Sequence, residues 1–354
     1  MKYHPEIFVP ILIILSLFSQ WEQQQVLAEP QVPCFFIFGD SIVDNGNNNF
    51  RQTTSRADFL PYGIDFPGGP TGRFSNGRNI ADILAELLGF EKHIPRYANA
   101  TNEDFVGGVN YGSGGAGILD ETGTTLGDVI SFNEQLSNHK GTVRRLAELL
   151  GGRLAARRHL RKCIYYVGLG NNDYLLNYFP KFYSSSAPYN PQNFTSLLIA
   201  QYSNQLRKLY RYGARKVAMF GTGVLGCVPL QITKYGGTDS SGCVGTINEV
   251  SSLFNQKLKR VISDLNNRLV DATFIYTNDT VTSYGNITNL TDPCCNVLTS
   301  DGACIAGTVP CNNREEHFFW DAVHPSEAAT MITGKVAYIS MSPLYSTTDL
   351  IQTW

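Results

Sequence analysis

The chain has 354 residues, of which 43% are hydrophobic and 16% are charged. This composition provides a sizeable core and argues against a disordered protein. The formal net charge at pH 7 is −2, so charge gives no reason to expect binding to nucleic acid or to an anionic membrane surface. The length fits one large α/β domain or two small ones.

The N-terminal residues have the pattern of a secretory signal peptide. Lys2 precedes an apolar run at 8–18; a polar stretch follows, and then Val26-Leu27-Ala28 with small residues where a signal peptidase cleaves. The run is too short for an ordinary transmembrane helix, although an uncleaved membrane anchor is the alternative interpretation. We therefore predict a signal peptide at 1–28, a secreted mature protein and no stable membrane insertion.

Short apolar runs bounded by turns alternate with amphipathic stretches along the rest of the chain. The apolar runs predict strands at 35–38, 105–111, 163–169, 216–220 and 272–276. Helical spacing predicts helices at 80–88, 132–150, 194–212, 247–270 and 325–339. This alternation indicates an α/β protein whose parallel sheet is covered by helices on both faces.

The sequence shows no internal repeat and no linker between two domains. The segment 279–314 is rich in Cys, Asn and Gly and lacks periodicity. We interpret it as a disulfide-tied, glycosylated excursion, and we expect one domain over 29–354.

Eight cysteines follow the predicted cleavage point, and four of them fall within 294–311. Disulfides are the default expectation in a secreted chain. The alternative is a zinc site, but the spacings do not match paired Cys-x₂-Cys ligands and no His lies at ligand spacing. Cys227 and Cys243 are near enough along the chain to close a local loop, but the sequence does not determine the pairing.

The chain also contains Asn-x-Ser/Thr sequons, which accept N-linked glycans in secreted proteins. The predicted glycosylation sites are Asn99, Asn193, Asn278, Asn286 and Asn289.

Ligands bind beyond the carboxyl ends of the strands in a parallel α/β sheet, so candidate catalytic residues should follow predicted strands. Ser41 does so, in the segment FGDSIVDNG at 38–46. A serine on a glycine-containing turn at this edge is exposed and has a free backbone amide. Serine also commonly caps helix N-termini, and this segment alone does not decide between nucleophile and cap.

A second candidate element is WDAVHP at 320–325. A serine hydroxyl needs a base to take its proton, and an imidazole held by a carboxylate is the usual solution. Asp321 and His324 are three residues apart and can meet on one turn, while Pro325 suits the first position of a helix. The alternative is an incidental histidine on an exposed turn. His317 is the nearest rival, but it has no carboxylate in the same Asp-x-x-His register.

Two turn-rich segments offer donors for a developing oxyanion. The glycines of GSGGAG at 112–117 could present free backbone amides, although such a loop could also bind phosphate. The segment is neither a P-loop nor a clean G-x-G-x-x-G, and no G-x-S-x-G nucleophile elbow surrounds Ser41 or Ser113. Asn172 follows the third predicted strand and could donate its side-chain amide, but asparagine in a loop is more often a turn residue.

Taken together, these segments resemble the GDSL (SGNH) hydrolases, and particularly their large secreted plant branch. The resemblance covers residues 36–338 and rests on FGDSIVDNGNN at 38–48, TGRFSNGR at 71–78, GVNYGSGGAG at 108–117, GNNDY at 170–174 and DAVHP at 321–325. The sequence departs from the family pattern at Ile42, where Leu is usual, and at Gly112, where Ala is more usual. Both changes leave the catalytic set in place, and Ile and Leu have similar volumes.

The resemblance implies a secreted serine esterase or lipase that hydrolyses carboxylic esters through an acyl-enzyme. It implies Ser41 as nucleophile, His324 as general base and then general acid, and Asp321 as the residue that orients His324. It also implies a three-layer α/β/α sandwich with a flavodoxin-like, five-stranded parallel sheet and no metal or organic cofactor. We expect a secreted protein (extracellular or apoplast), and the sequence leaves the final compartment open among apoplast, vacuole and wall. Activity should be lost below about pH 6, where an imidazole base becomes protonated.

The same resemblance implies an oxyanion hole with three donors. These are the backbone amide of Ser41, the backbone amide of Gly115, with Gly114 the close alternative, and the side chain of Asn172.

Two other functions remain open at this stage. An acyltransferase or transacylase could use the same serine, and a non-catalytic secreted glycoprotein could bind an ester or a polysaccharide at a retired site. The partner we expect is a small-molecule or polymeric ester, and we expect a monomer. Aromatic residues near the motifs could line an acyl pocket, but we interpret most of them as core: Phe74, Tyr111, Tyr174, Phe179, Phe319 and Trp320.

Overall fold

Four short parallel strands form the centre of the fold. The computed structural model describes residues 29–237, 239–277 and 283–345, so the predicted signal peptide and Asn278 lie outside the described residues. The strands pair in the order β1 (Phe35–Gly39), β2 (Ile164–Gly168), β3 (Lys216–Phe220) and β4 (Thr273–Thr277). All five residues of β1 are buried, as expected for a strand that is covered on both faces.

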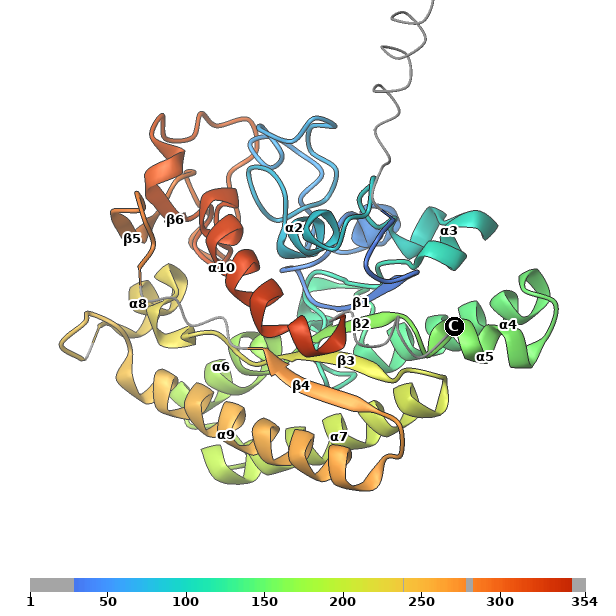
Figure 1. The fold of residues 1–354 in the computed structure, drawn as a ribbon. Coiled ribbons are helices and arrows are strands. Elements are labelled where there is room, and N and C mark those ends of the chain that lie inside the picture. Colours follow the sequence, from blue (N-terminus) through green and yellow to red (C-terminus); the bar gives the residue numbers. More distant parts are fainter. Residues whose placement is uncertain (1–28, 238, 278–282, 346–354) are drawn as a thin grey trace, which may run out of the picture. The chain divides into compact units, whose positions relative to one another are not determined.

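Helices cover the two faces of this sheet (Figure 1). One face packs against α2 (Ile80–Leu87) and α10 (Glu327–Ser340), and the other against α4 (Phe132–Leu149), α7 (Pro191–Arg211) and α9 (Gly245–Arg268). Successive side chains of β1 point to opposite faces of the sheet. Phe35 and Ile37 pack in the core with α2 and α10, whereas Phe36 and Phe38 pack in the core with α4, α7 and α9. The other α-helices of the described residues are α3 (Asn102–Gly107), α5 (Arg153–Leu160), α6 (Phe179–Tyr183) and α8 (Pro229–Tyr235).

The three-layer α/β/α architecture predicted from the sequence is confirmed, and the described residues from Gln31 onward form one compact unit. Within the described part of the chain, every helix is too short or too polar to cross a bilayer.

The predicted strand at 105–111 is wrong in its first half, so the five-stranded sheet becomes four strands and a bridge. Thr101 and Asp104 form a capping box that starts α3 in this segment, and Gly108 (φ 105°) ends the helix. The chain then meets β1 only briefly: the amide of Ile37 donates to the carbonyl of Val109 at 3.1 Å.

Two further expectations are corrected near the C-terminus. Pro325 is not the first residue of a helix, because Ser326 caps α10 and the helix begins at Glu327. The excursion at 279–314 is not wholly irregular, since it contains β5 (Asn289–Pro293), which pairs in parallel with β6 (His317–Phe319).

All eight cysteines form disulfides, so the zinc interpretation is wrong. The predicted local loop at Cys227–Cys243 is present, and the other pairs are Cys34–Cys163, Cys294–Cys311 and Cys295–Cys304.

Candidate active site

Ser41 lies on a tight turn directly after β1. The carbonyl of Asp40 accepts hydrogen bonds from the amides of Val43 (3.2 Å) and Asp44 (3.1 Å), and its carboxylate accepts from the amide of Ile42 (3.0 Å). These bonds close the turn at the carboxyl end of the sheet. Ser41 is therefore not a helix N-cap, and that alternative is wrong.

The structure brings Ser41, His324 and Asp321 together in one chain of hydrogen bonds. Nε2 of His324 lies 2.7 Å from Oγ of Ser41, and Nδ1 lies 2.8 Å from Oδ2 of Asp321. Asp321 is fully buried, and its Oδ1 accepts the amides of Val323 and His324 at 2.7 Å each. An imidazole in this position can take the serine proton while the carboxylate fixes its tautomer.

Two aromatic residues contact this chain of hydrogen bonds. The hydroxyl of Tyr62 donates to Oδ2 of Asp321 at 2.6 Å. The ring of Phe74 lies 4.8 Å from the imidazole of His324, measured between ring centroids. Both side chains are buried in one cluster with Trp320. The sequence had placed Phe74 near the site as a core residue, but Tyr62 lies outside every motif considered there.

The amides of the glycine-rich loop beside β1 differ in whether they already donate to a partner. Gly114 donates its amide to Oδ2 of Asp44 at 2.8 Å, so this donor is already engaged. Within the described ranges, the amides of Gly115 and Ser41 donate to no other residue. Gly115 has φ +82°, a left-handed conformation that glycine adopts without a steric penalty. These contacts favour Gly115 over Gly114 as the oxyanion donor.

Asn172 lies at the start of the short helix Asp173–Tyr178 after β2, and its side chain reaches across to the glycine-rich loop. Its Nδ2 donates to the carbonyl of Ala116 at 3.0 Å, and the residue is 7% exposed. The side chain makes no capping bond to its own helix. The interpretation of Asn172 as a simple turn residue is therefore not supported.

Buried polar residues of the first motif hold the glycine-rich loop in place. Nδ2 of Asn47 donates to the carbonyls of Asn110 (2.9 Å) and Gly112 (2.8 Å). Nδ2 of Asn48 donates to the carbonyl of Gly114 at 2.9 Å. Both asparagines belong to the motif at 38–48, from which no role for them could be predicted; here they tie the glycine-rich loop to the segment that follows Ser41.

Besides Asp40, whose pKa burial also raises, two buried carboxyl groups beside the site have altered pKa values. Burial raises the pKa of Asp44 to about 6, although hydrogen bonds from the amides of Gly114, Gly46 and Asn47 act in the opposite direction. Burial likewise raises the pKa of Asp173 to about 6, opposed by the amides that it accepts. Both groups act as hydrogen-bond acceptors that shape the loops rather than as contacts to Ser41.

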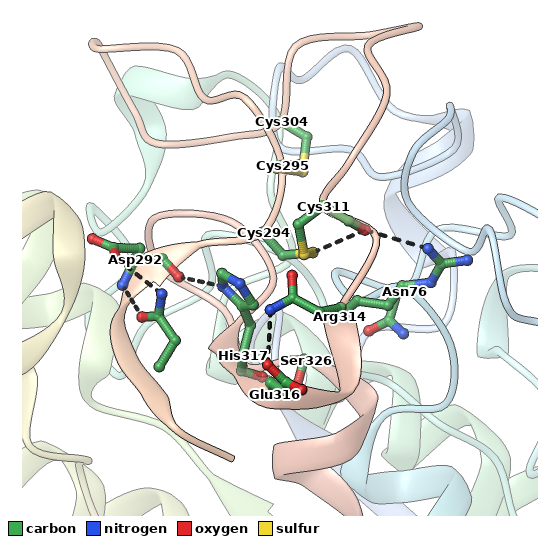
Figure 2. Close-up of a disulfide and its surroundings, with 12 residues drawn as sticks. Asn76, Asp292, Cys294, Cys295, Cys304, Cys311, Arg314, Glu316, His317 and Ser326 are labelled. Atoms are coloured by element: carbon green, nitrogen blue, oxygen red, sulfur yellow. Dashed lines mark hydrogen bonds between the residues drawn. A yellow bond between two sulfur atoms is a disulfide. The ribbon is translucent and has the colours of Figure 1, made fainter. Parts of the chain in front are cut away.

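The rival His317, and likewise His139, lies away from the hydrogen-bond chain of Asp321, His324 and Ser41. The Nδ1 atom of His317 lies 3.1 Å from the carbonyl of Asp292. Figure 2 shows this contact as a dashed line. His139 is buried among aromatic rings, and burial lowers its pKa to about 3.

One cluster of metal-ligand types occurs within residues 29–237, 239–277 and 283–345: Cys34, His159 and Cys163. Two of its three members share a disulfide, so their sulfurs are not available as thiolate ligands.

The described sequons differ in exposure. Asn99, Asn193 and Asn286 are exposed, whereas Asn289 is half-buried and its Nδ2 donates to Asp292 at 2.9 Å.

The aromatic residues that we predicted to be mostly core are all buried: Phe74, Tyr111, Tyr174, Phe179, Phe319 and Trp320.

Comparison with known proteins gives consistent matches over most of the chain. Residues 35–336 match the family model described as GDSL-like Lipase/Acylhydrolase. One GDSL esterase/lipase of Arabidopsis thaliana is 48% identical over 326 residues, covering 89% of each chain. A second from the same plant is 47% identical over 347 residues, covering 94% of this chain and 93% of the relative.

Solved structures that are similar include a catalytic mutant of an acetylxylan esterase from Geobacillus stearothermophilus. It has a TM-score of 0.41 and 12% identity, covering 87% of this chain and 94% of the other. An extracellular lipase from Streptomyces rimosus has a TM-score of 0.33 and 14% identity, covering 86% of this chain and 97% of the other. The family model and the plant relatives carry the assignment: this chain belongs to the GDSL-like lipase/acylhydrolase family and is a carboxylic ester hydrolase.

Proposed function

We propose that this protein hydrolyses carboxylic esters through a covalent acyl-enzyme on Ser41. The observation that carries the proposal is the unbroken hydrogen-bond chain from Asp321 through His324 to Ser41, with heavy-atom distances of 2.8 and 2.7 Å. These distances fall within the range in which a base can take a proton from its nucleophile.

In the acylation step, Oγ of Ser41 forms a bond to the carbonyl carbon of the ester. His324 takes the serine proton, and the carbonyl oxygen gains the negative charge. The amides of Ser41 and Gly115 and the side chain of Asn172 stabilise this oxyanion. The carbonyl then re-forms, the bond to the alkoxy oxygen breaks, and His324 donates its proton to the departing alcohol.

In the deacylation step, water takes the place of the alcohol. His324 removes a proton from the water as it attacks the acyl carbon, and the same donors stabilise the second oxyanion. Collapse of this intermediate returns the proton to Oγ of Ser41 and releases the carboxylic acid. Asp321 remains ionised throughout and stabilises the imidazolium.

The proposal includes secretion and N-glycosylation. Four disulfides suit an oxidising compartment, and the sequence at 1–28 has the pattern of a signal peptide. Exposure favours glycans on Asn99, Asn193 and Asn286. Expression in a eukaryotic host should release into the culture medium a protein whose first residue is Glu29 and whose mass falls on enzymatic deglycosylation. Retention of residues 1–28 in the exported protein would contradict this part.

A panel of p-nitrophenyl esters of graded chain length, together with acetylated xylan, tests the catalytic proposal. The unsubstituted protein should release acid from at least one of these esters, and Ser41→Ala should abolish the release while the protein stays folded by circular dichroism. Ser252→Ala, an exposed serine on α9, is the matched control and should keep full activity. Full activity of Ser41→Ala would remove Ser41 from the mechanism. Product analysis with added alcohol separates hydrolysis from transacylation.

A further inference from the structure

Oδ2 of Asp321 accepts a second hydrogen bond besides the one from His324. The hydroxyl of Tyr62 donates to it at 2.6 Å, and the oxygen of the same hydroxyl accepts the backbone amide of Cys304 at 3.0 Å. Asp321 and Tyr62 are fully buried and Cys304 is 1% exposed, so water does not compete for these bonds. Two successive hydrogen bonds therefore join the amide of Cys304, the hydroxyl of Tyr62 and the carboxylate of Asp321.

The direction of the tyrosine proton is fixed by its two partners. A backbone amide only donates, so the phenol oxygen must accept from Cys304 and its single proton must point to Asp321. Burial, together with the negative charge of Asp321, raises the pKa of Tyr62 well above its usual range, so the phenol keeps that proton. Tyr62 is therefore a fixed donor to the carboxylate.

The amide of Cys304 belongs to a loop that two disulfides close. We call residues 294–311 the clasp loop; Figure 2 shows its pairs Cys294–Cys311 and Cys295–Cys304. On one side, the amide of Gly307 in this loop donates to the carbonyl of Leu60 at 2.9 Å, two residues before Tyr62.

On its other side, the clasp loop holds the turn that carries Asp321 and His324. The amides of Cys294 and Cys295 both donate to the carbonyl of Trp320 at 3.0 Å. The carbonyl of Gly302 accepts the amide of Ala322 at 2.9 Å. The clasp loop thus bonds to the residues on both sides of Asp321 and to the segment that carries Tyr62.

We propose that Tyr62 is a positioning residue for the Asp321–His324 pair, and that the clasp loop sets the direction of its hydroxyl. This inference rests on the proposed function, because it concerns the carboxylate that orients the base. It gives the clasp loop a specific part in the reaction: its backbone fixes the hydroxyl of Tyr62, which in turn holds the carboxylate of Asp321.

Loss of the Tyr62 hydroxyl has two consequences for the reaction. Oδ2 of Asp321 is then held by His324 alone, so the carboxylate and the imidazole lose their fixed orientation. The charge on Oδ2 is also less neutralised, which favours the protonated imidazole and moves the acidic limb of the rate profile to higher pH. A residue that only filled space would produce no such displacement.

Tyr62→Phe tests this role because it removes the hydroxyl and keeps the ring. The readout is the rate at which a fluorophosphonate modifies the full-length secreted protein, measured between pH 4 and pH 9. We expect a rate about tenfold lower at the plateau, the size of a lost hydrogen bond to a charged group, and an acidic limb displaced to higher pH. Tyr165→Phe is the matched control, since this buried tyrosine bonds the carbonyl of Leu160.

The outcomes separate this inference from the proposed function. A plateau and an acidic limb in Tyr62→Phe that equal those of the unsubstituted protein overturn the role of Tyr62 alone. Labelling that survives Ser41→Ala overturns the proposed function, and this inference with it.

A double replacement of Cys295 and Cys304 by serine tests the contribution of the clasp loop. Loss of this disulfide should slow labelling when Tyr62 is present. It should slow labelling little further in Tyr62→Phe, because that variant already lacks the hydrogen bond from residue 62 to Asp321. The pair Cys227 and Cys243, replaced in the same way, is the control for loss of a local disulfide. An equal slowing factor in both backgrounds shows that the clasp loop does not act through Tyr62 and contradicts that part of the proposal.

Discussion

The side-chain amide of Asn172 donates to the carbonyl oxygen of Ala116 at 3.0 Å, which joins the segment after β2 to the glycine-rich loop beside β1. One of the two amide protons is used in this bond, and the other is the one that the proposed function assigns to a substrate oxygen. The bond also fixes Asn172 relative to Gly115, the adjacent residue in the loop. Two of the three proposed oxyanion donors are therefore held as one unit.

Asn172→Ala should lower kcat and leave KM nearly unchanged, because the donor acts on a charge that exists only in the transition state. Loss of one such donor costs about 10²–10³-fold in kcat. Steady-state kinetics on the best p-nitrophenyl ester measures the effect. Asn177→Ala, whose side chain accepts a bond from Lys181, is the matched control. An unchanged kcat in Asn172→Ala would show that Asn172 does not stabilise the oxyanion.

Asp321→Asn should reduce kcat by about 10⁴-fold while the fold is kept. The carboxylate accepts four hydrogen bonds in a fully buried position, and an amide cannot accept all four. It would present a donor to His324 or to the backbone and so fix the wrong tautomer of the imidazole. Single-turnover kinetics, with circular dichroism to check the fold, measures the loss. A decrease below about tenfold would argue against an orienting role for Asp321.

Asp173→Asn should change how stability depends on pH. In the folded protein burial raises the pKa of Asp173 from 3.8 to about 6, so between about pH 4 and pH 6 the folded state binds a proton that the unfolded state has lost. This stabilising contribution is fully present below about pH 4 and is lost as the pH rises through about 6. The asparagine variant does not titrate there.

Chemical denaturation of the unsubstituted protein and of Asp173→Asn at pH 4 and pH 7 measures the contribution of Asp173 to the free energy of unfolding. The free energy of unfolding of the unsubstituted protein, minus that of Asp173→Asn, should fall by about 2 kcal/mol from the lower to the higher pH. A difference that stays constant, or that grows with pH, would contradict the raised pKa of Asp173.

Most of the sheet could be predicted from the sequence because its strands are continuous apolar runs between turns. The segment 105–111 misled this approach. Phe105 and Val106 do pack against the core, but they do so from a helix, since the capping box of Thr101 and Asp104 outweighs the apolar run. Local hydrogen bonds from side chains to the backbone compete with strand formation. Composition alone does not show whether they outweigh an apolar run that favours a strand.

The members of the candidate site could be named because each lies in a motif directly after a predicted strand or on the Asp-x-x-His turn. Tyr62 could not, because its significance depends on a partner 259 residues away along the chain. The choice between Gly114 and Gly115 also needed the structure, since only the bond from Gly114 to Asp44 shows which amide is already occupied.

Peptide mapping after fluorophosphonate treatment tests the central claim most directly. The account predicts a single adduct on Ser41 in the peptide that follows β1, no adduct in Ser41→Ala, and labelling slowed by orders of magnitude in His324→Ala because the base is lost. An active, folded protein that carries the adduct on another residue, or that labels equally fast without the imidazole, would contradict the account.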